Sequence, residues 1–251
     1  MSRLGYGEFE LDLSEAIRRD LPPFVRQVPL APLTAEAIEM LPETQGVYAL
    51  YLDGELVYVG KTSSEEGFKQ RVGRHRKHVQ HRLDLDPSKI QFKAVRIMVF
   101  NMFDVEKILI EEAGGVAGNG KRAPWNYSGF GGNDPGVERD TQKVARFDKR
   151  HPILVDLELD FLTPGSYPLN MLLTTSRKSL PYTFRFEKEL YQDERAVTIE
   201  GNSPPTARQI LGAAIEALPH GWQATVLPGR VILYEEARIY RHSQLEIRKS
   251  A

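Results

Sequence analysis

The chain of 251 residues contains no cysteine. This absence excludes a disulfide framework, thiolate zinc sites and cysteine nucleophiles, so any metal must be held by oxygen or imidazole ligands. No run approaches the ~18 consecutive apolar residues of a membrane span. Acidic residues stand among the first fifteen positions, where a signal peptide would carry an apolar core. We therefore expect a cytoplasmic protein with no membrane partner.

The chain also lacks an excess of either charge, with 33 Lys and Arg against 34 Asp and Glu. Proteins that bind phosphates often have an overall basic excess, which is missing here. The average conceals a segregation, because residues 61–96 hold ten cations and four anions, and residues 238–251 hold four cations and one anion. Local positive fields of this kind attract polyanions even when the whole molecule is neutral.

Length and composition predict one main core with an appendage. With 41% hydrophobic and 27% charged residues, the chain is a globular protein rather than a disordered one. The character of the sequence changes after Leu162, where a Thr-Pro-Gly turn follows. We expect an N-terminal arm over residues 1–45, a main domain over 46–162 and a C-terminal α+β accessory unit over 163–251.

The strongest local signal is a hairpin, in which GVYALYL and ELVYVG flank the turn dipeptide Asp53-Gly54. Both faces of these strands are apolar, so we expect the hairpin to be central and covered on both sides. Other patterns predict further helices and strands. Helices are expected at 34–41 with Thr34 as N-cap, within 65–82, at 105–113 with Asp104 as N-cap, and at 207–218; strands are expected at 88–100, 168–174, 182–189, 196–200, 222–227 and 230–236. The fold class is α+β, with a small mixed or antiparallel sheet around the central hairpin.

Tyr48 and Tyr58 stand on the two strands of this hairpin, and Gly60 and Lys61 follow at the end of the second strand. With a simple two-residue loop, Tyr48 would pair with Val59, and Tyr58 would point to the opposite face of the sheet. A three-residue loop or a bulge would instead put both phenols on one face. A site shared by the two tyrosines therefore requires such a shift of register.

Arg71 and His75 are four residues apart and so lie on one helical face. An arginine at this spacing can hold a phosphate while the imidazole handles a proton, although a solvated basic helix gives the same pattern. His75, His78 and His81 resemble a metal cluster, but the interleaved cations oppose a metal ion.

A carboxylate and an amide complete the candidate set. Glu106 begins a predicted helix beside an apolar stripe, and a carboxylate there suits a hard divalent cation. Glu111 and Glu112 compete for that role. Asn126 follows Trp125 in a loop, where its amide can hold a phosphate, order a catalytic residue or simply form a turn.

In chain order, the series G-V-Y, Y-V-G-K, R-x-x-x-H, E-x-x-L-I and W-N resembles the GIY-YIG nuclease superfamily. The order Tyr, Tyr, Arg, His, Glu, Asn is similar to its type II restriction endonuclease branch, as are the stretches GFGGNDPG and FDKRHP. The resemblance covers roughly residues 40 to 155. Two departures are a valine at position 47 and a long segment between Glu106 and Asn126.

The resemblance implies a GIY-YIG fold and Mg²⁺-dependent hydrolysis of a DNA phosphodiester, with Mn²⁺ as an alternative ion. It implies roles for six catalytic residues and a set of phosphate-binding cations. The catalytic residues are Tyr48, Tyr58, Arg71, His75, Glu106 and Asn126, with Glu106 as metal ligand and Lys61, Arg74 and Lys77 as substrate-binding cations. Tyr48 is expected to act as base, which requires nearby cations to lower its pKa from ~10.

The resemblance further implies a double-stranded DNA substrate and a homodimer on DNA, because each chain offers one site and both strands must be cut. The loop at 128–136 and the C-terminal unit are candidates for base reading. Alternative functions are a structure-specific or repair nicking nuclease, a modification-dependent host-defence nuclease, and a non-catalytic DNA-binding protein with the same fold.

Overall fold

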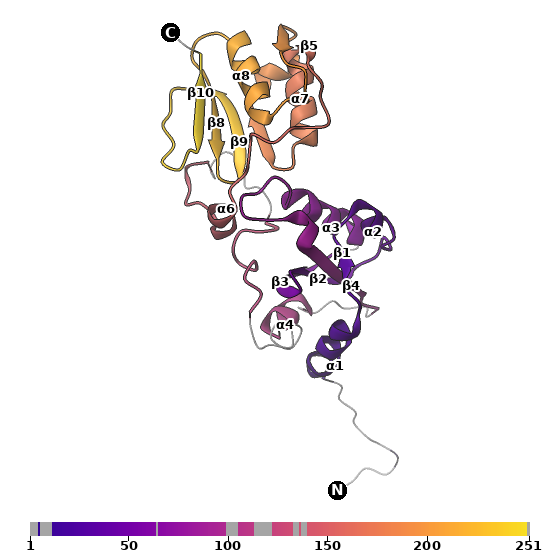
Figure 1. The fold of residues 1–251 in the computed structure, drawn as a ribbon. Helices are drawn as coiled ribbons and strands as arrows, with labels where there is room; N and C mark the ends of the chain where they lie inside the picture. The colour runs from indigo at the N-terminus through magenta and orange to yellow at the C-terminus, as the bar shows by residue number, and fades with distance from the viewer. Residues whose placement is uncertain are drawn as a thin grey trace. The chain divides into compact units, whose positions relative to one another are not determined.

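A computed structural model describes residues 5, 12–63, 65–98, 105–112, 122–132, 136 and 140–249, with only the backbone at 13, 14, 105 and 106. These residues form helices and three mostly antiparallel sheets (Figure 1), which confirms the α+β class. The chain divides into two compact units. The first comprises residues 1–74 and 88–127, and the second comprises residues 75–87 and 128–251.

The first unit is built on a four-stranded antiparallel sheet in the order β1-β4-β2-β3. Its strands are β1 (Ala31–Pro32), β4 (Ile90–Arg96), β2 (Gly46–Leu52) and β3 (Glu55–Lys61). Asp53 and Gly54 have φ angles of 51° and 81°, the positive values that a two-residue hairpin turn of type I′ requires. The predicted hairpin is therefore confirmed, with β2 inside the sheet and β3 at its edge.

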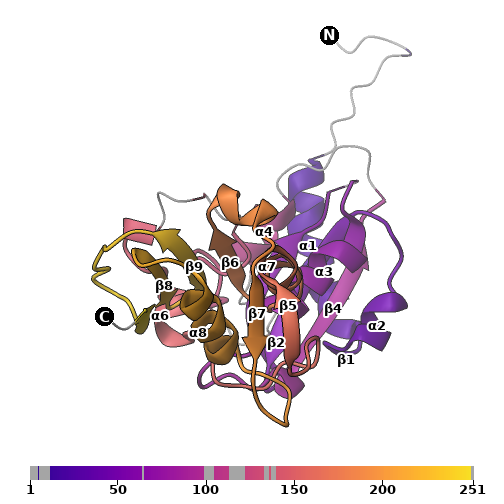
Figure 2. The same cartoon turned by 90° about the horizontal axis from the view of Figure 1, so that it is seen from above.

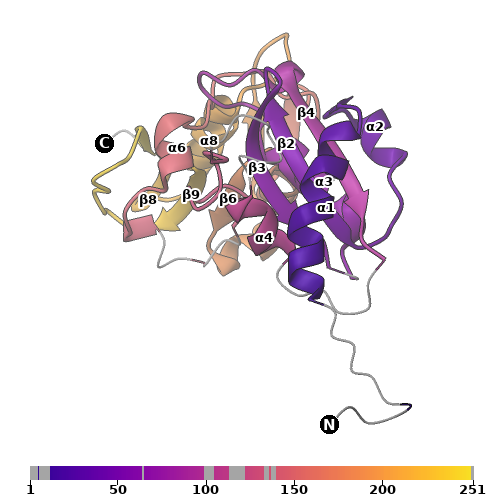
Figure 3. The ribbon, with the colours of Figure 1, turned by 90° about the horizontal axis from the view of Figure 1, so that it is seen from below.

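Helices cover both faces of this hairpin, as its two apolar faces predict. Helices α1 (Leu13–Gln27) and α4 (Val105–Glu111) lie on one face, where Val47 and Ala49 of β2 pack with Val25 and Leu109. Helix α3 (Gly67–His78) lies on the other face (Figures 1 and 3). Gly46 allows this approach, because a Cβ atom there would lie 2.5 Å from the ring of Phe68.

The sequence pattern does not predict α1, since Pro22 and Pro23 suggest a break. The helix nevertheless packs on the sheet through Val25. Its C-terminal carbonyls are held by Lys93 of β4, whose buried Nζ donates to the carbonyl oxygens of Val25 at 3.1 Å and Arg26 at 3.0 Å. Burial of the apolar face outweighs the loss of two backbone donors, so the predicted arm is part of the first unit.

Most other predicted elements form with shorter bounds. Helix α2 (Ala35–Glu39) has Thr34 as its N-cap, with the hydroxyl accepting from the Ala37 amide at 3.3 Å. Helix α3 ends four residues before Arg82, and a 3₁₀ turn, η1 (Pro87–Lys89), precedes β4. The predicted N-cap Asp104 lies outside the described residues.

The second unit contains a four-stranded sheet in the order β10-β8-β9-β6, with β6 parallel to β9. Among the residues that the structure describes, this unit also contains helices α6, α7 and α8, the 3₁₀ turn η3 and a separate antiparallel pair, β5 and β7 (Figure 2). Their bounds are β6 (Thr183–Phe186), β8 (Trp222–Leu227), β9 (Arg230–Glu235), β10 (Leu245–Arg248), β5 (Gly165–Pro168), β7 (Ala196–Ile199), α6 (Arg146–Arg150), α7 (Leu169–Ser179), α8 (Ala207–Ala217) and η3 (Lys188–Gln192).

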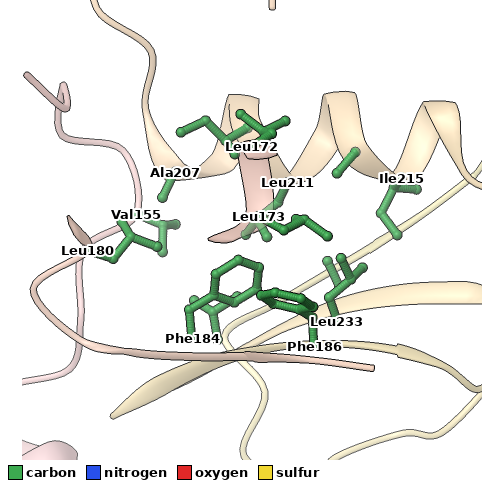
Figure 4. Close-up of a cluster of buried hydrophobic side chains, with 14 of the residues drawn as sticks. Val155, Leu172, Leu173, Leu180, Phe184, Phe186, Ala207, Leu211, Ile215 and Leu233 are labelled. Carbon is green, nitrogen blue, oxygen red and sulfur yellow. The ribbon is translucent and has the colours of Figure 1, made fainter. Parts of the chain in front are cut away.

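The prediction of a strand at residues 168–174 is wrong, because this segment begins helix α7. Leu169, Leu172 and Leu173 recur at helical spacing and are fully buried, and Figure 4 shows the last two in one cluster with Phe184. A short apolar run fits a buried strand and a buried helix equally well, and here the contacts with the core select the helix.

The structure also divides the chain at other positions than the predicted domain bounds. Ile153, Val155 and Leu159 belong to the core of the second unit, and the Ile153 amide donates to the carbonyl of Pro228 at 2.9 Å. The segment before Leu162 therefore joins the C-terminal unit. A Thr-Pro-Gly turn marks a change of direction, whereas a domain boundary depends on where apolar side chains are buried. None of the described helices is long and apolar enough to cross a membrane.

Candidate active site

Tyr48 and Tyr58 lie on the same face of the first sheet. The hairpin turn has two residues, since Leu52 pairs with Glu55, but the register shifts at Leu50 and Tyr51. This bulge leaves Leu50 opposite Tyr58 and Tyr48 opposite Gly60. The two tyrosine rings are 6.1 Å apart between centroids. The condition set by the sequence for a shared site is thus met through a bulge.

Gly60 makes room for this pair of rings. A Cβ atom at position 60 would lie 2.6 Å from Tyr48 Cζ and 2.8 Å from Tyr58 Cε1, and it would also meet the Tyr48 hydroxyl. No side chain fits without displacing one or both phenols. Packing against the two tyrosine rings, rather than backbone conformation, therefore requires the glycine two residues after Tyr58.

Helix α3 brings a guanidinium to the two phenols. Arg71 Nε donates to Tyr48 Oη at 3.3 Å, and Arg71 Nη1 is 3.9 Å from Glu66 Oε2. The other oxygen of Glu66 accepts from Arg74 Nη2 at 2.5 Å, and this contact lowers the pKa of the carboxyl. Glu66, which the sequence reading did not single out, thus holds two arginines together with one carboxylate.

Burial raises the pKa of Tyr48 far above its ordinary value, and the neighbouring phenol of Tyr58 adds to the shift. The charge and hydrogen bond of Arg71 oppose this effect without overcoming it. Tyr48 is only 2% exposed and Tyr58 6%. Among the described residues, the neighbours of Tyr48 therefore keep it a neutral phenol, in contrast to the expected lowering of its pKa.

Asn126 binds the edge of β3. Its Oδ1 accepts from the Val59 amide at 2.9 Å, and its Nδ2 donates to the Val59 carbonyl at 2.8 Å. The amide of Trp125 donates to the carbonyl of Val57 at 2.8 Å, and Val57 is the residue that the bulge leaves without a partner in β2. A contact of Asn126 with a phosphate stays a prediction, and the side chain of Asn126 orders the strand edge. It fixes the strand between Tyr58 and Gly60.

Replacing this amide should loosen the strand edge. We expect Asn126→Ala to destabilise the protein by about 2–4 kcal/mol, because the buried N–H and C=O of Val59 both lose their partner. Amide hydrogen exchange at Val59 should become faster, whereas the exposed Asn202→Ala should change stability by less than about 0.5 kcal/mol. Unchanged exchange at Val59 in Asn126→Ala would contradict this role for the side chain.

His75 is 1% exposed, and its ring stacks on Phe130 with centroids 4.9 Å apart. His78, three residues further along the helix, packs edge-on against Phe130 and Phe147. Both rings thus belong to an aromatic cluster with Phe130 and Phe147. This burial does not favour the predicted role of His75 in proton transfer. The cations on both sides of His75 in the sequence gave no indication that its side chain is buried.

The predicted substrate-binding cations have different surroundings. Lys61 is exposed at the end of β3, and Arg74 pairs with Glu66. Lys77 Nζ donates to the carbonyl of Lys178 at 2.6 Å, at the C-terminal end of α7, and its role in substrate binding stays a prediction. Burial lowers the pKa of Lys77.

Two further cations of the basic segment are internal. Arg82 is buried and donates to Asp148 at 2.8 Å and to the carbonyl of His151 at 3.0 Å, and Lys93 holds the end of α1. Asp148 and His151 belong to the FDKRHP stretch, whose role is therefore a structural one within the second unit. The external field of residues 61–96 is weaker than the count of cations suggests.

The carboxylate of Glu106 lies outside the described side chains, so it stays a predicted ligand. Its two competitors are engaged elsewhere: Arg18 of α1 donates to Glu111 at 2.9 Å and to Glu112 at 3.5 Å. Within the described part of the chain, no three His, Asp or Glu side chains form a group able to hold a metal ion.

Thr62, which no sequence pattern singled out, joins the two strands at the open end of the hairpin. Its buried hydroxyl accepts from the Gly46 amide at 2.9 Å, and its own amide donates to the Gly46 carbonyl at 2.9 Å. The position directly after Lys61 was the only signal for it. No family model matches the chain, and a search of curated proteins gives no match.

Proposed function

We propose that this protein is a Mg²⁺-dependent endonuclease that hydrolyses phosphodiester bonds in double-stranded DNA, as a site-specific type II restriction enzyme of the GIY-YIG superfamily. The observation that carries the proposal is the convergence of Tyr48, Tyr58 and Arg71 on one face of the sheet. The bulge in β3 is needed for this convergence, because with a regular two-residue hairpin Tyr58 would point to the opposite face of the sheet from Tyr48 and Arg71.

This arrangement suits a reaction in which negative charge grows on a phosphate. The oxygen of a water molecule forms a bond to phosphorus, the bond from phosphorus to the sugar oxygen breaks, and that oxygen takes up a proton. Arg71 supplies a fixed positive charge. Its planar guanidinium can also donate two parallel hydrogen bonds to two oxygens of one phosphate. Such preorganised donors are most effective where water is excluded, as around the buried phenols.

Each residue receives a role consistent with its surroundings. Arg71 binds a nonbridging oxygen and stabilises the transition state. Tyr48, as a neutral phenol, and Tyr58 hold the attacking water and the phosphate through their hydroxyl groups. The proton of the water passes to solvent or to a nonbridging oxygen of the phosphate, and the departing sugar oxygen takes up a proton from solvent. Lys61 and Arg74 attract the DNA backbone, and Asn126 acts as a positioning residue.

Glu106 is proposed as the residue that holds the metal ion. Mg²⁺ keeps several of its waters and needs only one or two carboxylates beside the substrate phosphate, so a single glutamate is a sufficient donor set. The ion would supply positive charge that neutralises the phosphate oxygens. The pairing of Glu111 and Glu112 with Arg18 favours Glu106 among the three carboxylates.

Digestion of supercoiled plasmid and of methylated and unmethylated genomic DNA with Mg²⁺ tests this proposal. A restriction enzyme acting as a homodimer gives discrete fragments with uniform ends on end sequencing, whereas a nicking nuclease gives open circles. Cleavage confined to methylated DNA would identify the modification-dependent alternative. The absence of any cleavage with Mg²⁺ or Mn²⁺ would remove the enzyme assignment and leave a DNA-binding protein.

The choice of metal ligand is tested with a matched pair of variants on α4. We expect Glu106→Gln to reduce cleavage by at least about 10²-fold, because the amide binds a hard cation poorly and lacks the charge that compensates it. Glu111→Gln, which loses only a surface ion pair, should cleave like the unmodified protein. Cleavage rates under single-turnover conditions check both, and the reverse result would move the ligand to Glu111.

A further inference from the structure

The second unit contains a cavity of about 520 Å³, lined by residues 140–143 and 238–242. Its volume lies within the range of about 300–1,000 Å³ in which proteins bind small organic ligands. One wall is Tyr240, which packs with Leu227, Ile232 and Tyr234 of the β8–β9 hairpin. This is the face of the sheet that α7 and α8 do not cover, since those helices pack on the alternate residues of β8 and β9.

The lining of the cavity is cationic. Lys143, Arg238 and Arg241 carry fixed positive charges, and His242 lies beside them. All four residues are exposed, so their charged groups face solvent at the rim. Asp140 also lines the cavity, but it is buried and accepts from two arginines outside the lining, Arg185 and Arg230.

The loop of residues 238–242, which carries Arg238 and Arg241, is held in place by the sheet. Gln223 Nε2 donates to the carbonyl of Arg238 at 2.8 Å, and the amide of Gln244 donates to the carbonyl of Val226 at 2.7 Å. The guanidinium of Arg238 lies 5.4 Å from the centroid of the Tyr240 ring, a cation–π contact. Because the backbone of this loop is anchored on both sides, less conformational entropy of the loop is lost on binding.

We propose that this cavity binds a phosphorylated nucleoside, either as a nucleotide unit of a DNA strand or as a free nucleotide. The cations match its phosphate. Ile239, which is 82% exposed between Arg238 and Tyr240, offers an apolar surface on which a base packs. The inference rests on the proposed function for the choice of nucleic acid as the polyanion, and it gives the second unit a DNA-binding role separate from catalysis.

The test uses the full chain with the double variant Lys143→Ala/Arg241→Ala. The matched control is Lys178→Ala/Lys188→Ala, which removes two exposed lysines of the same unit outside the cavity. Fluorescence anisotropy with a labelled DNA duplex, in EDTA and at several salt concentrations, measures binding without cleavage. Calorimetry with a deoxynucleoside monophosphate and with inorganic phosphate measures binding of the free ligands.

We expect the cavity variant to lose at least about tenfold in affinity for the duplex. The magnitude of the slope of log K against log salt should decrease by about 2, because two contacts between a cation and a phosphate are removed. The control should retain both values. If the unmodified protein binds the free nucleotide and the cavity variant does not, while both bind the duplex equally, the ligand of the cavity is a free nucleotide and not a unit of DNA. Equal affinity of the cavity variant and the control for all three ligands would overturn the inference.

Cleavage assays separate this inference from the proposed function. If no preparation cleaves DNA but binding depends on Lys143 and Arg241, the nuclease assignment fails and the cavity remains a nucleic-acid site. If the cavity variant binds and cleaves like the unmodified protein, the inference fails while the nuclease assignment stands.

Discussion

Replacement of Arg71 by alanine should reduce DNA cleavage by about 10²- to 10³-fold or more while leaving DNA binding largely intact. The guanidinium is the cation that the structure places on the Tyr48 hydroxyl, at 3.3 Å. Removing one preorganised donor from a site where transition-state charge develops typically costs this factor. Binding survives because one phosphate contact among many is lost, and each contributes little to overall affinity.

Arg71→Lys should recover only part of the activity, since a lysine keeps the charge but loses the planar fork of donors. Arg76→Ala, on the same helix and outside the proposed site, serves as the control and should cleave normally. Single-turnover cleavage rates and anisotropy in EDTA provide the two measurements. Cleavage at the unmodified rate by Arg71→Ala would remove the phosphate-binding role of this side chain and with it the proposed mechanism.

A single methyl group at position 60 should have an effect of similar size on activity. In Gly60→Ala the new Cβ atom overlaps the rings of Tyr48 and Tyr58, so one or both must move. Overpacking of this kind costs about 1–3 kcal/mol of stability. A displacement of about 1 Å at reacting groups can reduce the rate by about 10²-fold. We therefore expect a melting temperature lower by several degrees and a loss of cleavage greater than the loss of folded protein.

Gly73→Ala is the matched control, because no atom lies within 4 Å of the added methyl group and the residue is inside helix α3. Alanine favours a helix over glycine by up to about 1 kcal/mol, so this variant should be as stable as the unmodified protein or slightly more so. Differential scanning calorimetry and cleavage rates compare the two. A Gly60→Ala protein with normal stability and activity would show that the two phenols need not lie where the structure has them.

Much of the fold follows from local sequence patterns. The hairpin around Asp53 and Gly54, the N-cap at Thr34 and the helix over 207–217 all form as their patterns predict, since turn chemistry and periodicity act over a few residues. The failures occur where distant contacts override local signals. Helix α1 forms in spite of its prolines because it packs on the sheet, and α7 is a helix because its leucines face a core.

The candidate site divides in the same way. The sequence by itself determined which residue types are present and in what order, and that order alone indicated two phenols, a guanidinium, an imidazole, a carboxylate and an amide. Only the tertiary structure decided how four of these polar groups are used. The bulge in β3 puts Tyr48 and Tyr58 on one face, Asn126 is bound to the strand edge, and His75 is buried against Phe130. Register, edge pairing and burial depend on contacts between residues far apart in the chain, which no local pattern encodes.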